Sequence, residues 1–187
     1  MLLSPGLIGR NVKSCIDRAN RSRSICSMDE HAAAQRSSLV RESLGSDVSA
    51  SVLLTDEADR VLLVKSVSGV YWTIPSAIAR EDEAPHDRAE RLMAEQLGVT
   101  ALAGRLLVIG WSPATKDHSR AVVNFLFEGG MIHNEESLVK DLSELTDARF
   151  FTWEQVEGVV SAVLAEWLEA ARQAREDSVP AYLPTVA

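Results

Sequence analysis

Residues 72–99 read WTIPSAIAREDEAPHDRAERLMAEQLGV, and they carry the clearest structural signals in the chain. Its second half predicts a helix over 85–97, because Pro85 suits a first helical turn and Gly98 suits the left-handed position that ends a helix. Apolar side chains recur every fourth residue from Ala89 onward, which gives the helix one apolar side. The stretch therefore predicts a loop followed by an amphipathic helix that packs against a core.

Strand signals flank this stretch on both sides. The segments rich in apolar and β-branched residues are 48–54, 60–65, 71–74, 106–111, 121–128 and 148–153. The polar turn at 55–59 joins the first two into a predicted hairpin, and residues 156–175 predict one long amphipathic helix. Strands interleaved with few helices predict an α+β fold, in which a central mixed β-sheet is covered on both faces.

The ends of the chain differ in composition from its middle. Residues 1–27 hold five basic side chains against one acidic side chain, and they predict a basic disordered tail, or residues upstream of a translation start at Met28. Residues 28–46 predict an N-terminal helical extension. The main domain is expected over 47–176, and 177–187 is expected to be a C-terminal tail.

Overall composition and charge exclude several classes of partner. The chain has 187 residues, of which 46% are hydrophobic, and a formal net charge of −8. Nucleic acids and anionic membranes attract positive proteins, so neither is expected as a partner. No uninterrupted apolar run is long enough to span a membrane. Cys15 and Cys26 are too few for a disulfide framework, which predicts a reducing, cytoplasmic setting.

The spacing of residues 77–99 resembles the Nudix box, the signature of the Nudix hydrolase family, which is written G-x5-E-x7-R-E-U-x-E-E-x-G-U with U apolar. Six of its nine defined positions agree, and these are Glu83, Arg91, Met93, Glu95, Gly98 and Val99. The resemblance covers residues 48–170 and implies a Nudix-like α/β/α sandwich. It also implies hydrolysis of a diphosphate linkage with Mg²⁺ or Mn²⁺, which the family holds through carboxylates on the box helix.

The departures from the box concern the metal site. Leu92 and Gln96 stand where the pattern has glutamates, so the resemblance leaves Glu95 as the candidate metal ligand and catalytic residue. Gln96 is a weak neutral oxygen donor, and Leu92 cannot act as a base. A hard divalent ion prefers several anionic oxygens, so weak metal binding is expected. The loss of general-base assistance alone lowers a rate by about 10²–10⁴.

The loop before the helix also departs from the box. Ser76 and Ala77 replace glycines, and if position 77 needs a positive φ, a Cβ there adds strain of about 1–2 kcal/mol. The resemblance implies a salt bridge between Glu83 and Arg91 that locks the loop onto the helix. Arg80 is a candidate phosphate contact. Acids beyond the box that could supply a further ligand are Asp117, Glu128, Glu135, Glu136, Asp141 and Glu144.

Aromatic side chains give a weaker signal. Trp72, Trp111 and Phe127 are candidates to line a base-stacking pocket, although aromatic residues in strands are more often core. Trp153 and Trp167 are expected to be packing residues.

Two classes of function follow from the sequence. The first is a divergent Nudix-family hydrolase with an impaired metal site, acting on a nucleoside-diphosphate-linked or other diphosphate-containing small molecule. The alternative is a catalytically silent Nudix-fold domain for ligand binding or scaffolding, or a different reaction in the same cleft. Whether the chain is an enzyme is left open. The expected partner is a small-molecule diphosphate or nucleotide, and a homodimer is left open as well.

Overall fold

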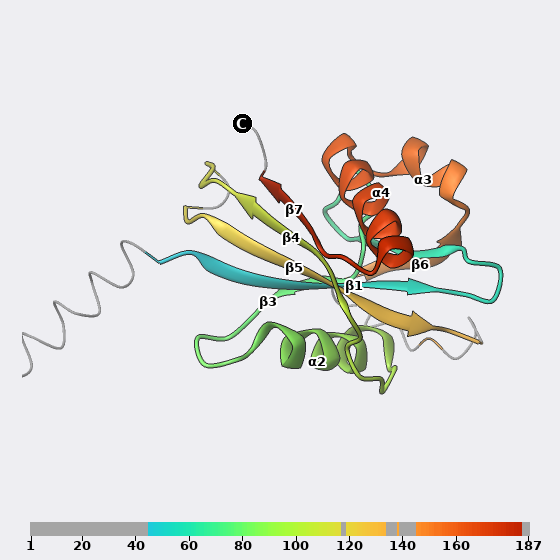
Figure 1. Cartoon of the computed structure of the whole chain (residues 1–187), viewed down its shortest axis with the longest axis horizontal. Helices are drawn as coiled ribbons and strands as arrows, with labels where there is room; N and C mark the ends of the chain where they lie inside the picture. Colours follow the sequence, from blue (N-terminus) through green and yellow to red (C-terminus); the bar gives the residue numbers. More distant parts are fainter. Residues whose placement is uncertain (1–44, 117–118, 134–137, 139–144, 185–187) are drawn as a thin grey trace, which may run out of the picture. The chain divides into compact units, whose positions relative to one another are not determined.

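The computed structural model describes residues 45–116, 119–133, 138 and 145–184. The expected tail over 1–27 lies outside these residues, as does the expected helical extension up to residue 44. Within the described part, a seven-stranded mixed sheet forms the centre of the domain (Figure 1). No described helix is long and apolar enough to cross a membrane.

The sheet has the strand order β6-β2-β1-β5-β4-β7, and β3 pairs with β1 beside this path. The strands are β1 (Asp47–Thr55), β2 (Val61–Ser66), β3 (Ser76–Ile78), β4 (Leu106–Ser112), β5 (Val122–Met131), β6 (Leu145–Phe151) and β7 (Ala181–Pro184). Two pairs are parallel, β1 with β5 and β4 with β7, and the others are antiparallel. The predicted hairpin is present, since β1 and β2 pair beside their turn at Thr55 and Val61.

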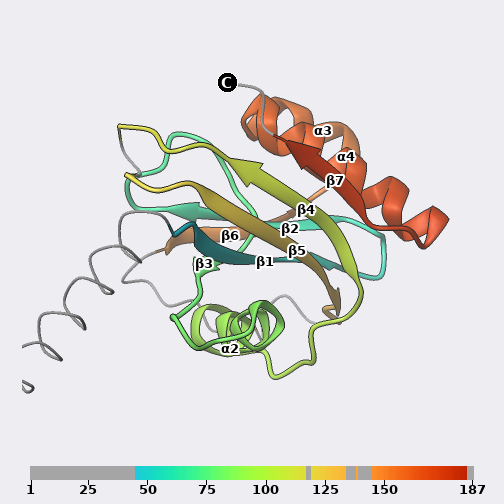
Figure 2. The same cartoon turned by 60° about the vertical axis from the view of Figure 1, so that its left-hand side comes forward.

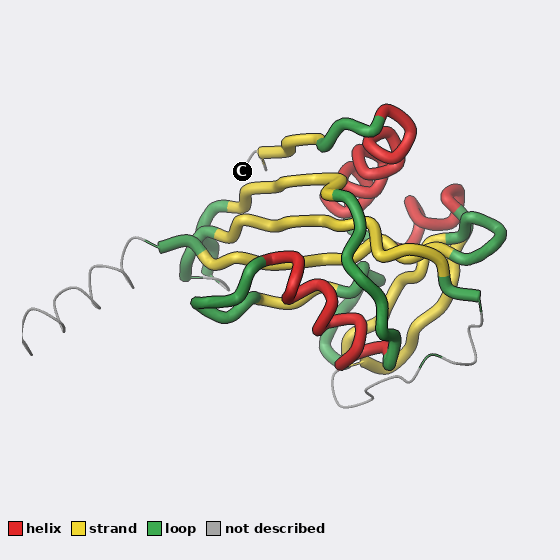
Figure 3. Tube along the Cα trace, turned by 60° about the horizontal axis from the view of Figure 1, so that its bottom comes forward, coloured by secondary structure: helices red, strands yellow, loops and turns green. Residues whose placement is uncertain are grey.

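Helices cover both faces of this sheet. Helix α2 (Pro85–Leu97) lies on one face, and α3 (Trp153–Val159) and α4 (Ala162–Asp177) lie on the other (Figure 2). Figure 3 shows α2 lying across the strands from the side of the sheet that it covers. The predicted α+β class, with a mixed sheet between helical layers, is therefore confirmed.

Alternation along β1 divides the core into two clusters. Val52 and Leu54 point to the α2 side and pack with Met93, whereas Leu53 points to the α4 side and packs with Leu168. Successive strand residues face opposite sides of a sheet, so a fully buried strand supplies both cores. The box helix α2 covers the first of these faces, and the pocket described below lies on the second.

The prediction of one long helix over 156–175 is wrong, because two helices form there. Val160 has an extended backbone (φ −101°, ψ 168°) and forms a bridge with Trp72, which ends α3. Ser161 then caps α4, since its side chain accepts a hydrogen bond from the Leu164 N–H at 3.3 Å. A contact with a distant segment thus overrides a continuous helical pattern.

The C-terminal segment also differs from the expected tail over 177–187. Ala181–Pro184 is strand β7, which pairs in parallel with β4 and completes that edge of the sheet. Ser178 turns the chain from α4 toward β7 with a positive φ of 59°. The last predicted strand, 148–153, also begins earlier than expected, because β6 spans Leu145–Phe151.

Candidate functional site

The segment that resembles the Nudix box forms β3, a turn and α2. Ala77 lies in β3 opposite Ala50 of β1, and it is half-buried against the α2 side of the core. Among the described residues, positive φ values outside glycine occur at Asp59 and Ser178. The Cβ of Ala77 therefore causes no left-handed strain, because Ser76 and Ala77 are part of an extended strand.

Local signals set both ends of α2. Pro85 occupies the first turn, and Gly98 has a φ of 66° and donates its N–H to the Ala94 carbonyl at 3.2 Å. The Val99 N–H reaches the Met93 carbonyl at 3.1 Å, which satisfies a second carbonyl at the helix end. The predicted bounds of this helix, 85–97, are confirmed.

The buried side of α2 includes Leu92. Its side chain is fully buried and lies in the same cluster as Ala89, Met93 and Leu97. At this position the Nudix box has a glutamate. Here the position belongs to the hydrophobic core, so it offers neither a metal ligand nor a proton acceptor.

The exposed side of α2 carries a network of ion pairs. Arg91 binds Glu83 through two parallel contacts, Nε to Oε1 at 2.7 Å and Nη2 to Oε2 at 2.8 Å. Its remaining nitrogen, Nη1, binds Glu95 Oε1 at 2.7 Å. The backbone N–H of Arg80 also donates to Glu83 at 3.0 Å. The turn before α2 is thereby fastened to the helix, as the spacing of Glu83 and Arg91 indicated.

Arg88 joins this network from the buried side. Arg88 is only 8% exposed, and its Nη1 binds Glu95 Oε2 at 3.0 Å. Its Nε donates to the carbonyl of Ile78 in β3 at 3.0 Å. Both carboxylate oxygens of Glu95 are therefore held by guanidinium groups, one from Arg88 and one from Arg91.

These contacts shift the protonation of both acids. The hydrogen bonds from Arg91, helped by the Arg80 backbone N–H, lower the pKa of Glu83 from 4.5 to about 2. The hydrogen bond from Arg91, helped by that from Arg88, also lowers the pKa of Glu95. Both side chains are therefore charged near neutral pH, but their charge is neutralised by arginines.

The box positions of α2 hold one carboxylate, that of Glu95, beside the apolar Leu92 and the amide of Gln96. Mg²⁺ needs hard oxygen ligands, and the anionic candidate on this face, Glu95, is already committed to two cations. Gln96 offers an amide oxygen, which is buried and has no hydrogen-bond partner within the described structure. Across the described ranges, no group of three His, Cys, Asp or Glu side chains could hold a metal.

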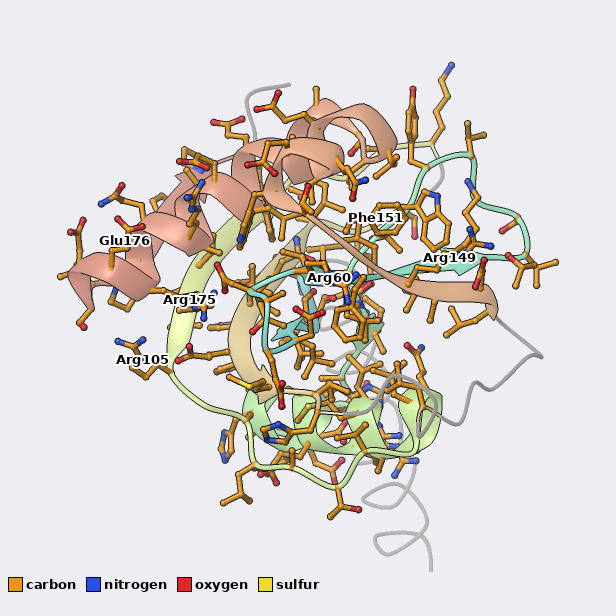
Figure 4. All side chains as sticks on the ribbon, turned by 90° about the vertical axis from the view of Figure 1, so that its right-hand side faces the viewer. Arg60, Arg105, Arg149, Phe151, Arg175 and Glu176 are labelled. Carbon is orange, nitrogen blue, oxygen red and sulfur yellow. The ribbon has the colours of Figure 1, made fainter. Side chains whose placement is uncertain are left out.

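Of the other acids that the sequence suggested as metal ligands, one lies among the described residues, and it is paired with arginines. Glu128 on β5 is bound by Arg105, which directly precedes β4, and by Arg175 of α4, at 3.2 and 3.3 Å; Figure 4 shows these two arginines near each other. The remaining candidates, Asp117, Glu135, Glu136, Asp141 and Glu144, lie outside the described residues.

The opposite face of the sheet carries an open pocket of about 420 Å³. It lies between the segment after β2 and the N-terminal half of α4, with β4 and β5 beneath it. Trp72 and Trp167 supply its large aromatic side chains, and Ser112 and Asn124 supply polar groups from the strands. Its size is within the range of small-molecule sites in proteins.

Sequence reasoning found part of this pocket. Trp72 was a candidate and does line it, whereas Phe127 belongs to the core on the α2 side, and Trp111 is 39% exposed and does not line it. Trp167 was expected to be a packing residue, but its ring also lines the pocket. Asn124 was not recognised, since a single asparagine in a strand carries no signal without knowledge of its neighbours.

Comparison with solved structures identifies the same fold in several proteins. A MutT protein from Methanosarcina mazei Go1 is 17% identical, with a TM-score of 0.61 over 70% of this chain and 96% of that one. A UDP-X diphosphatase is 16% identical, with a TM-score of 0.62 over 94% and 89% of the two chains. An ADP-ribose pyrophosphatase from Streptococcus suis is 18% identical, with a TM-score of 0.53 over 74% and 99%.

At the level of sequence, no curated protein matches the chain. The family model of the NUDIX domain, however, matches residues 45–174, which is more than half of the chain and includes the box segment, both helical layers and strands β1 to β6. On this evidence the chain belongs to the Nudix hydrolase family.

Proposed function

We propose that this Nudix domain binds a nucleotide or another diphosphate-containing small molecule, and that its metal-dependent hydrolysis is impaired. The observation that carries the proposal is the state of α2. Leu92 is buried in the core, and Glu95 is held by Arg88 and Arg91. Nudix hydrolases typically use divalent metals, and among the box positions 92, 95 and 96 the one carboxylate, that of Glu95, is bound by two arginines.

The chemical consequence concerns the attacking water. A divalent metal lowers the pKa of bound water and offsets the charge of the diphosphate, and a nearby carboxylate can accept the proton. Neither Leu92 nor Gln96 can accept that proton. Release of Glu95 for either role would leave Arg88, which is 8% exposed, without its carboxylate partner.

Ligand binding does not need these groups. The pocket on the α4 face is separated from α2 by the sheet and keeps its aromatic and polar side chains. Among the solved structures of the same fold is the NUDIX domain of Shewanella oneidensis NrtR in complex with ADP-ribose, which is 16% identical with a TM-score of 0.58. These observations favour a binding domain over an efficient hydrolase.

A divergent hydrolase is the second candidate, and the family assignment is the observation that favours it. In that case, acids from outside α2 would supply the metal ligands. The candidates are Glu135, Glu136, Asp141 and Glu144, which lie outside the described residues.

The two candidates differ in their response to metal. We expect a nucleotide or nucleoside diphosphate sugar to raise the melting temperature of the full chain equally with EDTA and with Mg²⁺ or Mn²⁺, without phosphate-ester products. Metal alone, at low millimolar concentration, should leave the melting temperature unchanged. Turnover that requires metal, or micromolar metal affinity by calorimetry, would support the hydrolase instead. If no member of a nucleotide panel bound, the proposed binding function would be wrong.

A further inference from the structure

We infer that strands β5, β4 and β7 form a docking surface on the α2 side of the sheet, and that its occupant is the same surface of a second copy of this chain. We name this surface the open face. Its six residues are Val123, Phe125, Ile109, Trp111, Tyr182 and Pro184. The inference involves neither the ligand nor hydrolysis, so it goes beyond the proposed function.

The register of the three strands places these side chains in two rows. Phe125 of β5 lies opposite Ile109 of β4, which in turn lies opposite Tyr182 of β7. The other three residues form the second row in the same way. Between the rows, Gly110 lies directly against the ring of Trp167 on the α4 side. Because successive residues of a strand face opposite sides of a sheet, both rows face the α2 side.

Helix α2 covers another part of the sheet. It packs mainly on β1 and β3, and Figure 3 shows β7, the strand that leads to the C-terminus, to one side of this helix. Tyr182 is therefore 64% exposed and Trp111 is 39% exposed, whereas Ile109, Val123 and Phe125 are half-buried. Apolar side chains that are exposed together on adjoining strands mark an interaction surface, unlike apolar residues scattered singly.

The charge of the open face selects its occupant. No residue of 106–112, 122–127 or 178–184 is charged, although 25% of the chain is. Since the chain has a net charge of −8, two copies repel each other wherever their acidic surfaces meet. At the open face no like charges oppose each other, so two copies can approach there. A basic partner, in contrast, finds no carboxylate on this face to pair with.

Strand β7 adds an unprotected edge to the open face. It is the last strand of the sheet, and within the described residues no strand pairs with its outer side. Sheet edges are usually protected by charged side chains, lysine above all, and Ala181–Pro184 has none. The contact between two copies can therefore extend from the open face to the main chain of β7. A contact between two identical surfaces closes after two copies, which predicts a dimer.

The size of the open face predicts a weak dimer. The exposed fractions of Tyr182 and Trp111 together equal about one whole aromatic side chain, or about 150–250 Å² in each copy. Two copies offer about 300–500 Å² from these rings, against about 1,600 Å² for an interface of standard size. The other four residues and the main chain of β7 supply the rest. An interface at the low end of this range dissociates at micromolar concentrations.

Sedimentation equilibrium of the full chain tests this surface, at about 1–200 μM protein and at about 50 and 300 mM NaCl. We expect a monomer–dimer equilibrium with a dissociation constant of about 10–100 μM. The dimer should be tighter at the higher salt concentration, because salt screens the repulsion between two acidic copies. A chain that stays monomeric over the whole range would overturn the inference. An affinity that falls with salt would overturn it too, since it would indicate ion pairs.

Variants assign the dimer to the open face. Tyr182→Glu places a carboxylate in each of the two facing surfaces and should weaken dimerisation at least about tenfold. Val67→Glu is the matched control, because Val67 is also 64% exposed but lies in the segment after β2, outside the open face. It should leave the dissociation constant within about twofold. Should Tyr182→Glu fail to fold, as judged by circular dichroism, Trp111→Gln removes an exposed ring of the same face and should also weaken the dimer about tenfold.

The outcomes for the two glutamate variants decide the inference. Equal weakening by Tyr182→Glu and Val67→Glu would overturn it, since added charge alone would then explain the effect. Wild-type association in Tyr182→Glu would overturn it as well, because the dimer would then form through another surface. The proposed function is tested by ligand and metal binding, so its failure would leave this result unchanged.

Discussion

Leu92 occupies a core position where the Nudix box has a glutamate, and we expect this change to be hard to reverse. Leu92→Glu would remove a fully buried side chain from its cluster and bury an unpaired carboxylate. The free energy of unfolding should fall by about 3–5 kcal/mol. Ala94→Glu, at an exposed position of the same helix, is the control and should change it by less than about 0.5 kcal/mol. Urea denaturation measures both, and equal stabilities of the two variants would contradict the burial of Leu92.

Glu83 makes the free energy of unfolding of the domain depend on pH. Its pKa is about 2 in the folded chain, below its ordinary value of 4.5, because Arg91 and the Arg80 N–H bind the charged form. A lowered pKa means that the contribution is complete above about pH 4.5 and is lost as the pH falls toward 2. We therefore expect Glu83→Gln to be less stable than the wild type at neutral pH.

The difference between wild type and Glu83→Gln should shrink at about pH 3, because the Glu83 carboxylate of the unfolded wild type is mostly protonated there, whereas that of the folded chain is still charged. Urea denaturation at both pH values measures this difference. A gap that stays constant over this range would show that the ion pair with Arg91 contributes nothing to folding stability.

At the level of elements, α4 begins at a serine cap that follows the break at Val160. The Ser161 hydroxyl caps the first turn of α4 by accepting the Leu164 N–H. Ser161→Ala should lower the free energy of unfolding by about 1 kcal/mol, and Ser161→Asn, which keeps a capping oxygen, should restore most of it. Thermal and urea denaturation measure both variants. If the alanine and asparagine variants were equally stable, the Ser161 hydroxyl would contribute nothing as the cap of α4.

The contrast between α2 and this junction shows what the sequence can predict. The ends of α2 depend on Pro85 and Gly98, which act within a few residues, so its bounds could be read from the chain. The break at Val160 depends on a bridge to Trp72, which lies 88 residues earlier in the sequence. A local helical pattern gives no sign of such a contact.

At the level of the whole molecule, β7 should contribute to stability. It pairs with β4, and its residues Ala181 and Leu183 pack against the core beneath α4. Deletion of residues 179–187 should lower the free energy of unfolding by about 1–3 kcal/mol, the range for burying one or two apolar side chains. Deletion of 185–187 alone is the control. If both truncations melted at the wild-type temperature, the packing of β7 would be without consequence.

The candidate site was predictable only in part, because much of it depends on contacts between segments that are distant in the sequence. The spacing of Glu83 and Arg91 indicated a pair that the structure contains, because both lie on or beside one helix. The pocket is built from the segment after β2, two strands and α4, which converge only after the sheet forms. The position of Leu92 in the core could be suspected from its apolar character, but the engagement of Glu95 by Arg88 required the fold.

The parallel pairing of β1 with β5 has a consequence for how the chain reaches its native state. Residues 47–55 lie beside 122–131, so the centre of the sheet joins segments about 75 positions apart. Contacts this distant raise the contact order, and domains dominated by them fold over milliseconds to seconds rather than microseconds. During synthesis, β1 can pair with β2 and β3 first, but its edge toward β5 stays unpaired until residues 122–131 have left the ribosome.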